Sequence, residues 1–83
     1  MGRMRRNIVG ERLRILRVQK GLSQTELSHQ LNACGIPIEN TVLCKMESGR
    51  RSISDYELFG IAQCLGISVG SFFEDEDIDT QFV

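Results

Sequence analysis

Apolar residues recur every three or four positions along most of the chain, which is the spacing of one face of an α-helix rather than that of a strand. In the first such segment Val9, Leu13 and Leu16 lie at i, i+4 and i+7. Asn7 is suited to cap the start of a helix and Gly21 to end one. The pattern therefore predicts a first helix between these two residues.

A second helix is predicted from a capping signal. Ser23 is followed three residues later by Glu26, an arrangement in which each side chain accepts a hydrogen bond from the other residue's backbone. Leu27 and Leu31 then follow at i, i+4, so one face of this helix is apolar.

A third helix, at about residues 39–48, is amphipathic in the same way. Leu43 and Met46 lie at i, i+3 on the face expected to be buried, and Gly49 follows as a residue that commonly ends helices. Two short helices in series, with a polar face of the second left free, are the layout of a helix-turn-helix.

The remaining pattern predicts two further helices. Ser54 and Glu57 repeat the capping arrangement, and Gly66 closes the helix that they begin. A short fifth helix follows, in which Phe72 and Phe73 are expected to close the core. The predicted fold class is all-α, a compact five-helix bundle that contains a helix-turn-helix.

Composition limits the size and class of the protein. The 83 residues, of which 41% are hydrophobic and only one is Pro, are expected to form a single domain. A domain of this size buries only about 60% of its unfolded surface, so it gains stability from association and a homodimer is expected. The absence of a run of about 18 apolar residues or a signal-peptide pattern predicts a protein that neither spans a membrane nor is secreted.

The cysteines exclude two kinds of site. Cys34, Cys44 and Cys64 are odd in number and form no C-x-x-C pair. This pattern predicts neither a disulfide framework nor a zinc site, and the chain suggests no other metal or cofactor. Reduced cysteines fit a cytoplasmic protein.

Charge is distributed unevenly. Residues 1–51 contain all 10 Lys and Arg and four Glu, a net charge of +6, whereas residues 52–83 contain the other seven acids and no base. A protein with one surface facing a polyanion would show such a division, although ordinary charge segregation gives it too. We expect a basic arm at 1–7, a helix-turn-helix domain at 8–73 and an acidic, disordered tail at 74–83.

Three ordered stretches carry a resemblance to a known family: GERLRILRVQKGLSQTEL, NTVLCKMESGRR and CLGISVGSFF. Together they resemble the lambda-repressor-like (Xre/Cro-type) helix-turn-helix family, over a span from about Ile8 to Phe73. The resemblance implies a lambda-repressor-like fold and sequence-specific binding to double-stranded DNA, with the helix at 39–48 in the major groove.

The polar face of that helix holds the candidate base-reading residues. A recognition helix enters the groove by its first turn, so Asn40 and Thr41 are expected to meet base edges, with Lys45 one turn further on. Cys44 could touch a thymine methyl group. The resemblance gives these four positions the base-reading role; the alternative is a solvated helix face.

Candidate phosphate contacts flank the recognition helix. Ser23 and Gln24 lie at a helix N-terminus, where free N–H groups and the helix dipole favour an anion. Arg50 and Arg51 directly follow the recognition helix and are placed to bind the DNA backbone. The alternative is that the two arginines are an ordinary surface pair.

Arg17 and Glu47 are assigned a structural role. The family pattern pairs the Arg before the first Gly with the Glu near the end of the recognition helix, and both are present here at matching positions. The resemblance therefore implies an ion pair that fixes how the recognition helix sits in the domain.

Two features depart from the family pattern. The residues Ala33–Pro37 are inserted where relatives have a tight turn, so either the second helix is longer or the turn becomes a loop. Glu39 occupies the usual Ser or Thr cap of the recognition helix, where its charge suits the helix dipole but repels a nearby phosphate. Glu39 could instead accept a hydrogen bond from cytosine N4.

Other functions have weaker signals. Ile8, Ile15 and Val18 form an apolar stripe on the first helix that could contact a protein partner, so the alternative function is an interaction module of the same fold, such as an antitoxin-like or regulatory adaptor. An enzyme is not expected, because His29 and Cys34 are the only conceivable nucleophile pair and no second domain forms a cleft. We expect a repressor-like transcriptional regulator that needs no cofactor.

Overall fold

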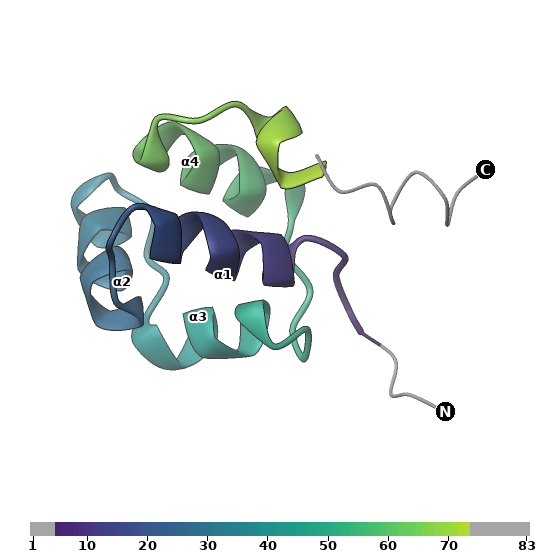
Figure 1. Ribbon diagram of the computed structural model, residues 1–83. Helices are drawn as coiled ribbons and strands as arrows, with labels where there is room; N and C mark the ends of the chain where they lie inside the picture. Colours follow the sequence, from purple (N-terminus) through teal and green to yellow (C-terminus); the bar gives the residue numbers. More distant parts are fainter. Residues whose placement is uncertain (1–4, 74–83) are drawn as a thin grey trace.

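Four α-helices and one 3-10 segment form the described part of the computed structural model, residues 5–73 (Figure 1). They are α1 (Gly10–Gln19), α2 (Gln24–Ala33), α3 (Asn40–Glu47), α4 (Asp55–Leu65) and the 3-10 helix η1 (Val69–Phe73). No strand occurs between residues 5 and 73, so the predicted all-α class is confirmed. The expected fifth helix is a 3-10 segment, which leaves four α-helices there rather than five. The predicted acidic tail lies outside the described residues.

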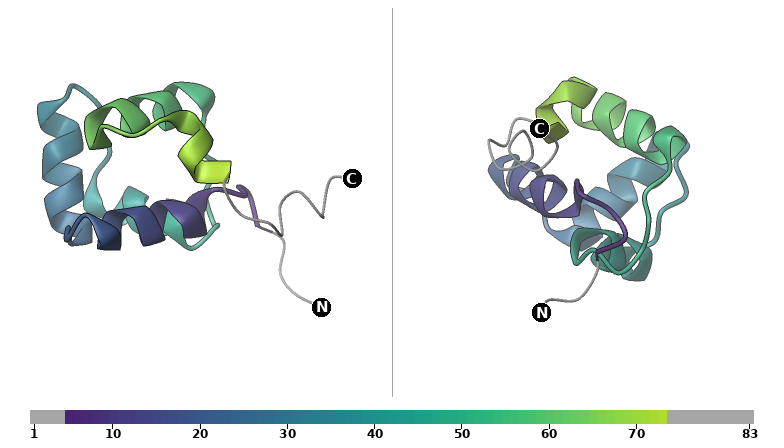
Figure 2. Two further views of the ribbon diagram at one scale, coloured as in Figure 1. Left: turned by 45° about the horizontal axis from the view of Figure 1, so that its top comes forward. Right: turned by 90° about the vertical axis from the view of Figure 1, so that its right-hand side faces the viewer.

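The helices surround one hydrophobic core (Figure 2). Each α-helix contributes the apolar face that its sequence spacing indicates, and η1 closes the core with Phe72, which is fully buried. Phe73 was also expected in the core, but it is 37% exposed. A 3-10 helix has three residues per turn, so two adjacent side chains point in different directions and only one of them faces inward. The core residues are Val9, Leu13, Leu16, Leu27, Leu31, Ile38, Leu43, Met46, Ile61, Ala62, Leu65 and Phe72.

Two helices begin with the capping box that the sequence predicts. The Ser23 hydroxyl accepts a hydrogen bond from the Glu26 N–H at 3.0 Å, and the Glu26 carboxylate accepts one from the Ser23 N–H at 2.8 Å. Ser54 and Glu57 make the same reciprocal pair at the start of α4. A capping box can be predicted from the sequence because all four interacting groups lie within one helical turn.

The inserted residues form a defined turn after α2. The helix ends at Ala33, and the next glycine, Gly35, has a φ of +87°. The N–H of Ile36 donates to the carbonyl of Leu31 at 2.8 Å, and that of Gly35 donates to Asn32 at 3.0 Å, which together form a Schellman motif. Of the two alternatives left by the sequence, the loop is therefore the observed one, and six residues separate α2 from α3.

The far end of this turn is anchored in the domain. Ile38 is buried, and its carbonyl oxygen accepts hydrogen bonds from Ser28 Oγ at 2.7 Å and Asn32 Nδ2 at 3.2 Å. Ile36 packs against Gly60 of α4, where a Cβ atom would come within 2.7 Å of its Cδ1 atom. The longer connection is thus packed against both α2 and α4.

Candidate nucleic-acid interface

Helix α3 presents two chemically different faces. Leu43 and Met46 are fully buried in the core. Asn40, Thr41 and Lys45 are exposed on the other side of the helix, and Cys44 lies beside them, half-buried. These positions recur at i, i+1, i+4 and i+5, so they share one face. The four residues expected to read bases therefore form one continuous strip of α3 that the domain leaves accessible.

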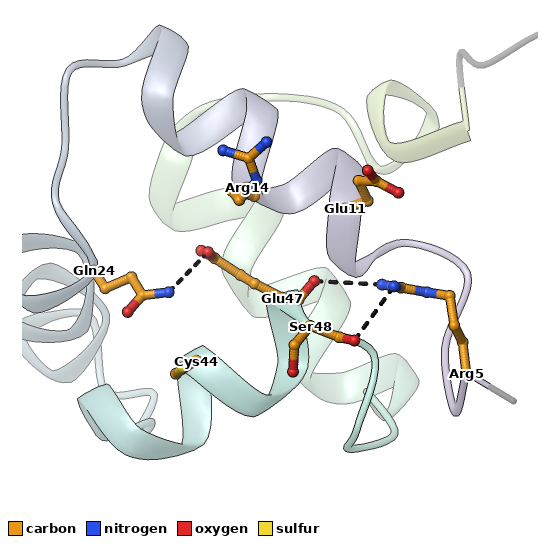
Figure 3. Close-up of a pocket in the computed structure, with 7 residues that line it drawn as sticks. All are labelled: Arg5, Glu11, Arg14, Gln24, Cys44, Glu47 and Ser48. Atoms are coloured by element: carbon orange, nitrogen blue, oxygen red, sulfur yellow. Dashed lines mark hydrogen bonds between the residues drawn. The ribbon is translucent and has the colours of Figure 1, made fainter. Parts of the chain in front are cut away.

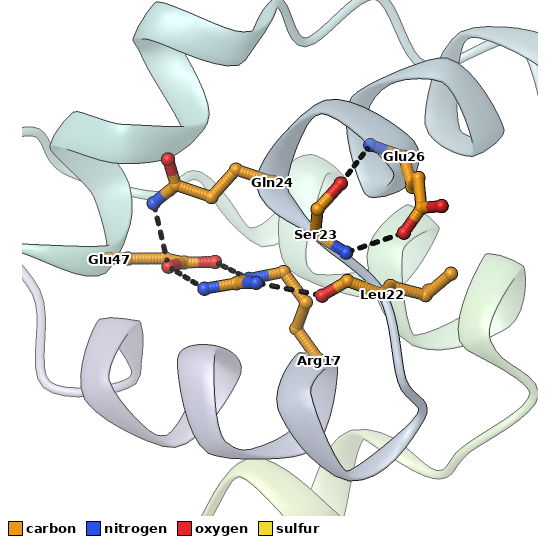
Figure 4. Close-up of polar contacts among 6 residues, drawn as sticks. All are labelled: Arg17, Leu22, Ser23, Gln24, Glu26 and Glu47. Atoms are coloured by element: carbon orange, nitrogen blue, oxygen red, sulfur yellow. Dashed lines mark hydrogen bonds and ion pairs between the residues drawn. The ribbon is translucent and has the colours of Figure 1, made fainter.

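A buried ion pair anchors α3 through its last residue, Glu47. Glu47 accepts hydrogen bonds from Arg17 of α1 in a two-pronged arrangement, from Nε at 2.7 Å and from Nη2 at 3.0 Å (Figure 4). The third guanidinium nitrogen, Nη1, donates to the carbonyl of Leu22 at 2.8 Å. Arg17 and Glu47 are only 9% and 5% exposed, so the pair lies in the interior of the domain. The fork of hydrogen bonds fixes both position and angle between α1 and α3.

Gln24 joins α2 to the same carboxylate. Its Nε2 atom donates to Glu47 Oε1 at 3.0 Å, while the amide oxygen of Gln24 points away from the pair (Figure 4). Glu47 therefore connects three helices: α1 through Arg17, α2 through Gln24, and α3, to which it belongs. Within the described residues every buried side-chain nitrogen and oxygen has a hydrogen-bond partner, so no unsatisfied polar group there reduces the stability that this network contributes.

The N-terminus of α2 lies next to this network. Its capping box satisfies the backbone N–H groups of Ser23 and Glu26. Those of Gln24 and Thr25 have no partner inside the helix, because the first N–H groups of any helix lack an acceptor one turn earlier. The Glu26 carboxylate at this end partly offsets the attraction of the helix dipole for an anion.

Helix α3 begins without a side-chain cap. Glu39 is the N-cap residue and has an extended backbone, but its carboxylate makes no capping hydrogen bond. The residue is exposed, so its charge lies beside the first turn of the strip that Asn40 and Thr41 begin.

The C-terminal end of α3 is held by the segment before α1, which sequence reasoning missed. The guanidinium of Arg5 donates to the carbonyls of Glu47 and Ser48, each at 3.3 Å (Figure 3). Asn7 Nδ2 donates to the carbonyls of Met46 at 3.0 Å and Arg51 at 2.7 Å. Cations and amide donors are favourable at a helix C-terminus, where carbonyls lack partners and the dipole is negative.

Asn7 therefore has two roles. Its side-chain oxygen accepts a hydrogen bond from the N–H of Gly10 at 2.6 Å, although the N-cap residue of α1 is Val9 and not Asn7, the residue that the sequence predicts. At Gly10 itself, a Cβ atom would overlap the carbonyl oxygen of Met46. Glycine at this position lets the start of α1 approach the backbone of α3 closely, and Asn7 bonds to both helices at the same point.

The two arginines after α3 differ in what they contact. Arg50 is exposed, and its Nε donates to the hydroxyl of Ser48 at 3.0 Å. Arg51 is half-buried and makes two parallel hydrogen bonds to Glu57 of α4, at 3.1 and 3.0 Å. The hydrogen bonds from Arg51 hold the pKa of Glu57 below its ordinary value, and Glu57 in turn raises the pKa of Arg51. The sequence predicted the same role, backbone binding, for both arginines, but in the structure only Arg51 forms an ion pair with α4.

A shallow hollow of about 250 Å³ lies between α1, α3 and the preceding segment (Figure 3). Arg14 projects from α1 toward this hollow, and Cys44 lines its floor on α3. Arg14 is exposed and was not singled out by sequence reasoning, because nothing in its local pattern distinguishes it from the other arginines of α1. The residues that line the hollow are Arg5, Glu11, Arg14, Gln24, Cys44, Glu47 and Ser48.

This arrangement is that of a helix-turn-helix in which α2 and α3 are locked together by Glu47. A family model described as Helix-turn-helix matches residues 13–72 of the chain. The chain belongs to the lambda-repressor-like (Xre/Cro-type) helix-turn-helix family. The family match begins within α1 and ends within η1, so it includes residues Ala33–Pro37.

Two solved structures are similar to this family member. A hypothetical transcription factor, NHTF from Neisseria, is 25% identical, with 96% of this chain and 86% of that chain covered and a TM-score of 0.70. The clp gene regulator ClgR from C. glutamicum is 23% identical, with 99% and 97% covered and a TM-score of 0.74, a likeness that bears on the fold alone. None of the curated proteins matches the chain.

Besides Phe73 of η1, large apolar side chains are exposed at two places within residues 5–73. On α1 and just before it, Val18 is 54% and Ile8 is 47% exposed, whereas Ile15 is half-buried. On α4, Tyr56 is 87% and Phe59 is 55% exposed. The first group corresponds to the stripe expected from the sequence, with Ile15 partly withdrawn into the domain. No helix within residues 5–73 is long and apolar enough to cross a membrane.

Proposed function

We propose that the protein is a sequence-specific regulator of transcription that binds double-stranded DNA with α3 in the major groove. The observation that carries the proposal is the contrast between the two sides of α3. Leu43 and Met46 on one side are buried in the core, and Glu47 at the C-terminal end bonds α3 to α1 and α2. On the other side Asn40, Thr41 and Lys45 are exposed. A groove-reading helix needs both properties, because base discrimination depends on side chains held in a fixed frame.

Base reading is assigned to the exposed strip. Asn40 can make a bidentate contact to adenine, and Lys45 can donate to the acceptors of guanine. Thr41 and Cys44 are suited to contact a thymine methyl group. Glu39 beside them is suited to accept from cytosine N4, which would turn a charge unfavourable near phosphate into a contributor to specificity.

Backbone contacts are assigned to the two borders of the strip. Ser23 and Gln24 supply the N-terminus of α2, and Gln24 retains one amide hydrogen and its oxygen beyond the bond to Glu47. Arg50 supplies an exposed cation at the other border. Arg51 contributes mainly by fixing the turn to α4, because its guanidinium is engaged by Glu57. We add Arg14, whose exposed guanidinium lies at the hollow next to Gln24.

The regulatory mode follows from size and chemistry. We propose a homodimer that binds a two-fold symmetric operator and acts as a repressor by occupying DNA, without a cofactor and without catalysis. A dimer doubles the base contacts of a domain whose recognition helix is only eight residues long. The protein-interaction alternative would use the exposed Ile8 and Val18 instead.

Selection of bound sequences from a random duplex pool, followed by titration of the selected site in a salt series, tests the proposal. We expect a two-fold related consensus and an affinity that falls steeply as salt rises, as counterion release requires. Sedimentation of the complex gives two protein chains per site if the dimer is correct. Failure to select any consensus, together with no salt-dependent binding to duplex DNA, would reject DNA reading in favour of the interaction module.

A further inference from the structure

Two cysteines outside the proposed DNA surface meet where α2 and α4 end. Cys34 is the C-cap residue of α2, and Cys64 lies in the last turn of α4. Both are free thiols, and their sulfur atoms are 2.6 Å apart. The two cysteines are 30 positions apart in the sequence, so their spacing could not predict this contact, and it predicted no disulfide framework.

Contacts between the C-terminal ends of α2 and α4 position the two sulfurs. Gln30 lies one turn before Cys34 on α2, and its Nε2 donates to the carbonyl of Cys64 at 3.4 Å. The thiol of Cys64 in turn donates to the carbonyl of Gln30 at 3.5 Å. Because two successive turns of α2 contact the same residue of α4, the thiols can be joined without a large backbone movement.

The two thiols differ in access. Cys34 is exposed, whereas Cys64 is half-buried. Burial, together with the neighbouring Cys34, raises the pKa of Cys64 to about 11. A thiolate attacks an external oxidant more readily when it is accessible and ionised, so reaction begins at Cys34. The third cysteine, Cys44, lies on α3 at the hollow and offers an internal comparison.

We propose that Cys34 and Cys64 form a site of reversible oxidative modification whose co-reactant is a low-molecular-weight disulfide. The Cys34 thiolate attacks one sulfur of the co-reactant, which forms a mixed disulfide and releases one thiolate. Cys64 then loses its proton and attacks the Cys34 sulfur, which forms the internal disulfide and releases the second thiolate. Two protein thiols are oxidised, and the co-reactant disulfide is reduced to two thiols.

The new bond would close a loop that contains the inserted turn and all of α3. It joins the C-terminal ends of α2 and α4, whereas the proposed DNA surface uses the N-terminal end of α2 (Figure 1). The modification therefore restrains the unfolded chain and leaves the reading strip accessible. The inference does not depend on DNA binding, because it rests only on the thiol pair.

The test treats the reduced full-length protein with oxidised glutathione and counts thiols under denaturing conditions. We expect the count to fall from three to one in the wild type, and from two to none in Cys44→Ser. Trypsin leaves Cys34 and Cys44 in one peptide, so the crosslink is mapped in Cys44→Ser, where residues 21–45 are expected to be joined to residues 52–83. Oxidation should raise the melting temperature by roughly 10 °C or more, as closing a loop of this length predicts.

Two single variants complete the test. In Cys34→Ser and Cys64→Ser the oxidant is expected to give no internal crosslink and no rise in melting temperature. An unchanged thiol count in the wild type, a crosslink that includes Cys44, or disulfides that form only between molecules would each overturn the proposal. The wild-type and Cys44→Ser results decide it even if one of the two single variants does not fold.

Discussion

Arg51, two residues after the glycine that ends α3, grips the carboxylate of Glu57 with two parallel hydrogen bonds of 3.1 and 3.0 Å. The same carboxylate accepts the N–H of Ser54 at 2.9 Å and so completes the capping box of α4. The Glu57 side chain therefore caps the start of α4 and also fixes the direction in which the chain leaves α3. The Arg51 side chain is 37% exposed, so solvent screening limits the strength of the ion pair.

The first prediction concerns pH. Arg51 lowers the pKa of Glu57, so the pair contributes stability above the ordinary glutamate pKa and loses it as the pH falls through the lower, folded value. Glu57→Gln keeps a side chain that can cap α4 but removes the charge. We expect it to cost up to about 1 kcal/mol of unfolding free energy at pH 7. Urea denaturation of both proteins across pH should show this difference shrinking below about pH 4.5; a constant difference would contradict the ion-pair explanation.

The second prediction concerns the buried carboxylate of Glu47. Glu47→Gln leaves the Arg17 guanidinium without its counter-charge in a site where both side chains are nearly buried, so we expect a loss of about 3 kcal/mol or more in unfolding free energy. Glu26→Gln is the matched control, because it makes the same chemical change in an exposed capping box and should cost little.

Operator titration of the Glu47 variant separates folding from reading. At a temperature where Glu47→Gln is still folded, its preference for the selected operator over random duplex is expected to stay close to that of the wild type. If Glu47→Gln melts at the wild-type temperature but no longer prefers the operator over random duplex, then Glu47 belongs to the base-reading surface and its role is not structural.

The third prediction separates base reading from backbone binding. Asn40→Ala is expected to cost about 1–3 kcal/mol on the selected operator and little on random duplex, whereas Arg50→Ala should weaken both and lower the salt slope by about one. Gln63→Ala, at an exposed polar position of α4, is the control. Fluorescence anisotropy titrations of the wild type and the three variants with both duplexes supply the affinities. Equal losses on both duplexes for Asn40→Ala would contradict its assignment to base reading.

The fourth prediction compares two glycines. In Gly10→Ala the new methyl group meets the rigid backbone carbonyl of Met46, so α1 must move away from α3 and we expect a loss of about 2 kcal/mol or more. In Gly60→Ala the methyl group meets only side-chain atoms, Cδ1 and Cγ1 of Ile36, which can change rotamer, and alanine gains up to about 1 kcal/mol of helix propensity. Thermal melting should rank Gly60→Ala near the wild type and Gly10→Ala well below it.

The features predictable from the sequence are those encoded within one or two helical turns. The capping boxes at Ser23 and Ser54 and the buried positions Leu43 and Met46 follow from spacing alone. Phe73 was misplaced because spacing cannot tell a last α-helical turn from a 3-10 turn.

The contacts that the sequence could not predict join distant segments. Arg5 and Ser48 are 43 residues apart, and a single arginine near a chain end carries no periodic signal. The pairing of Arg17 with Glu47 was inferred from family resemblance, because nothing in the local sequence of either residue identifies the other. Arg51 was grouped with Arg50 since both look like free cations until α4 is folded beside them.

The connection between α2 and α3 is six residues long, and contacts elsewhere fix the relative placement of the two helices. Gln24 and Glu47 join α2 to α3 at the end opposite the connection, and the added residues pack toward α4. We therefore expect that a change in the length of this segment leaves the placement of α3, and with it the proposed base reading, unaltered. For the same reason the segment is a suitable place to insert a reporter or a tag, provided that Ile36 and Ile38 keep their packing against the core.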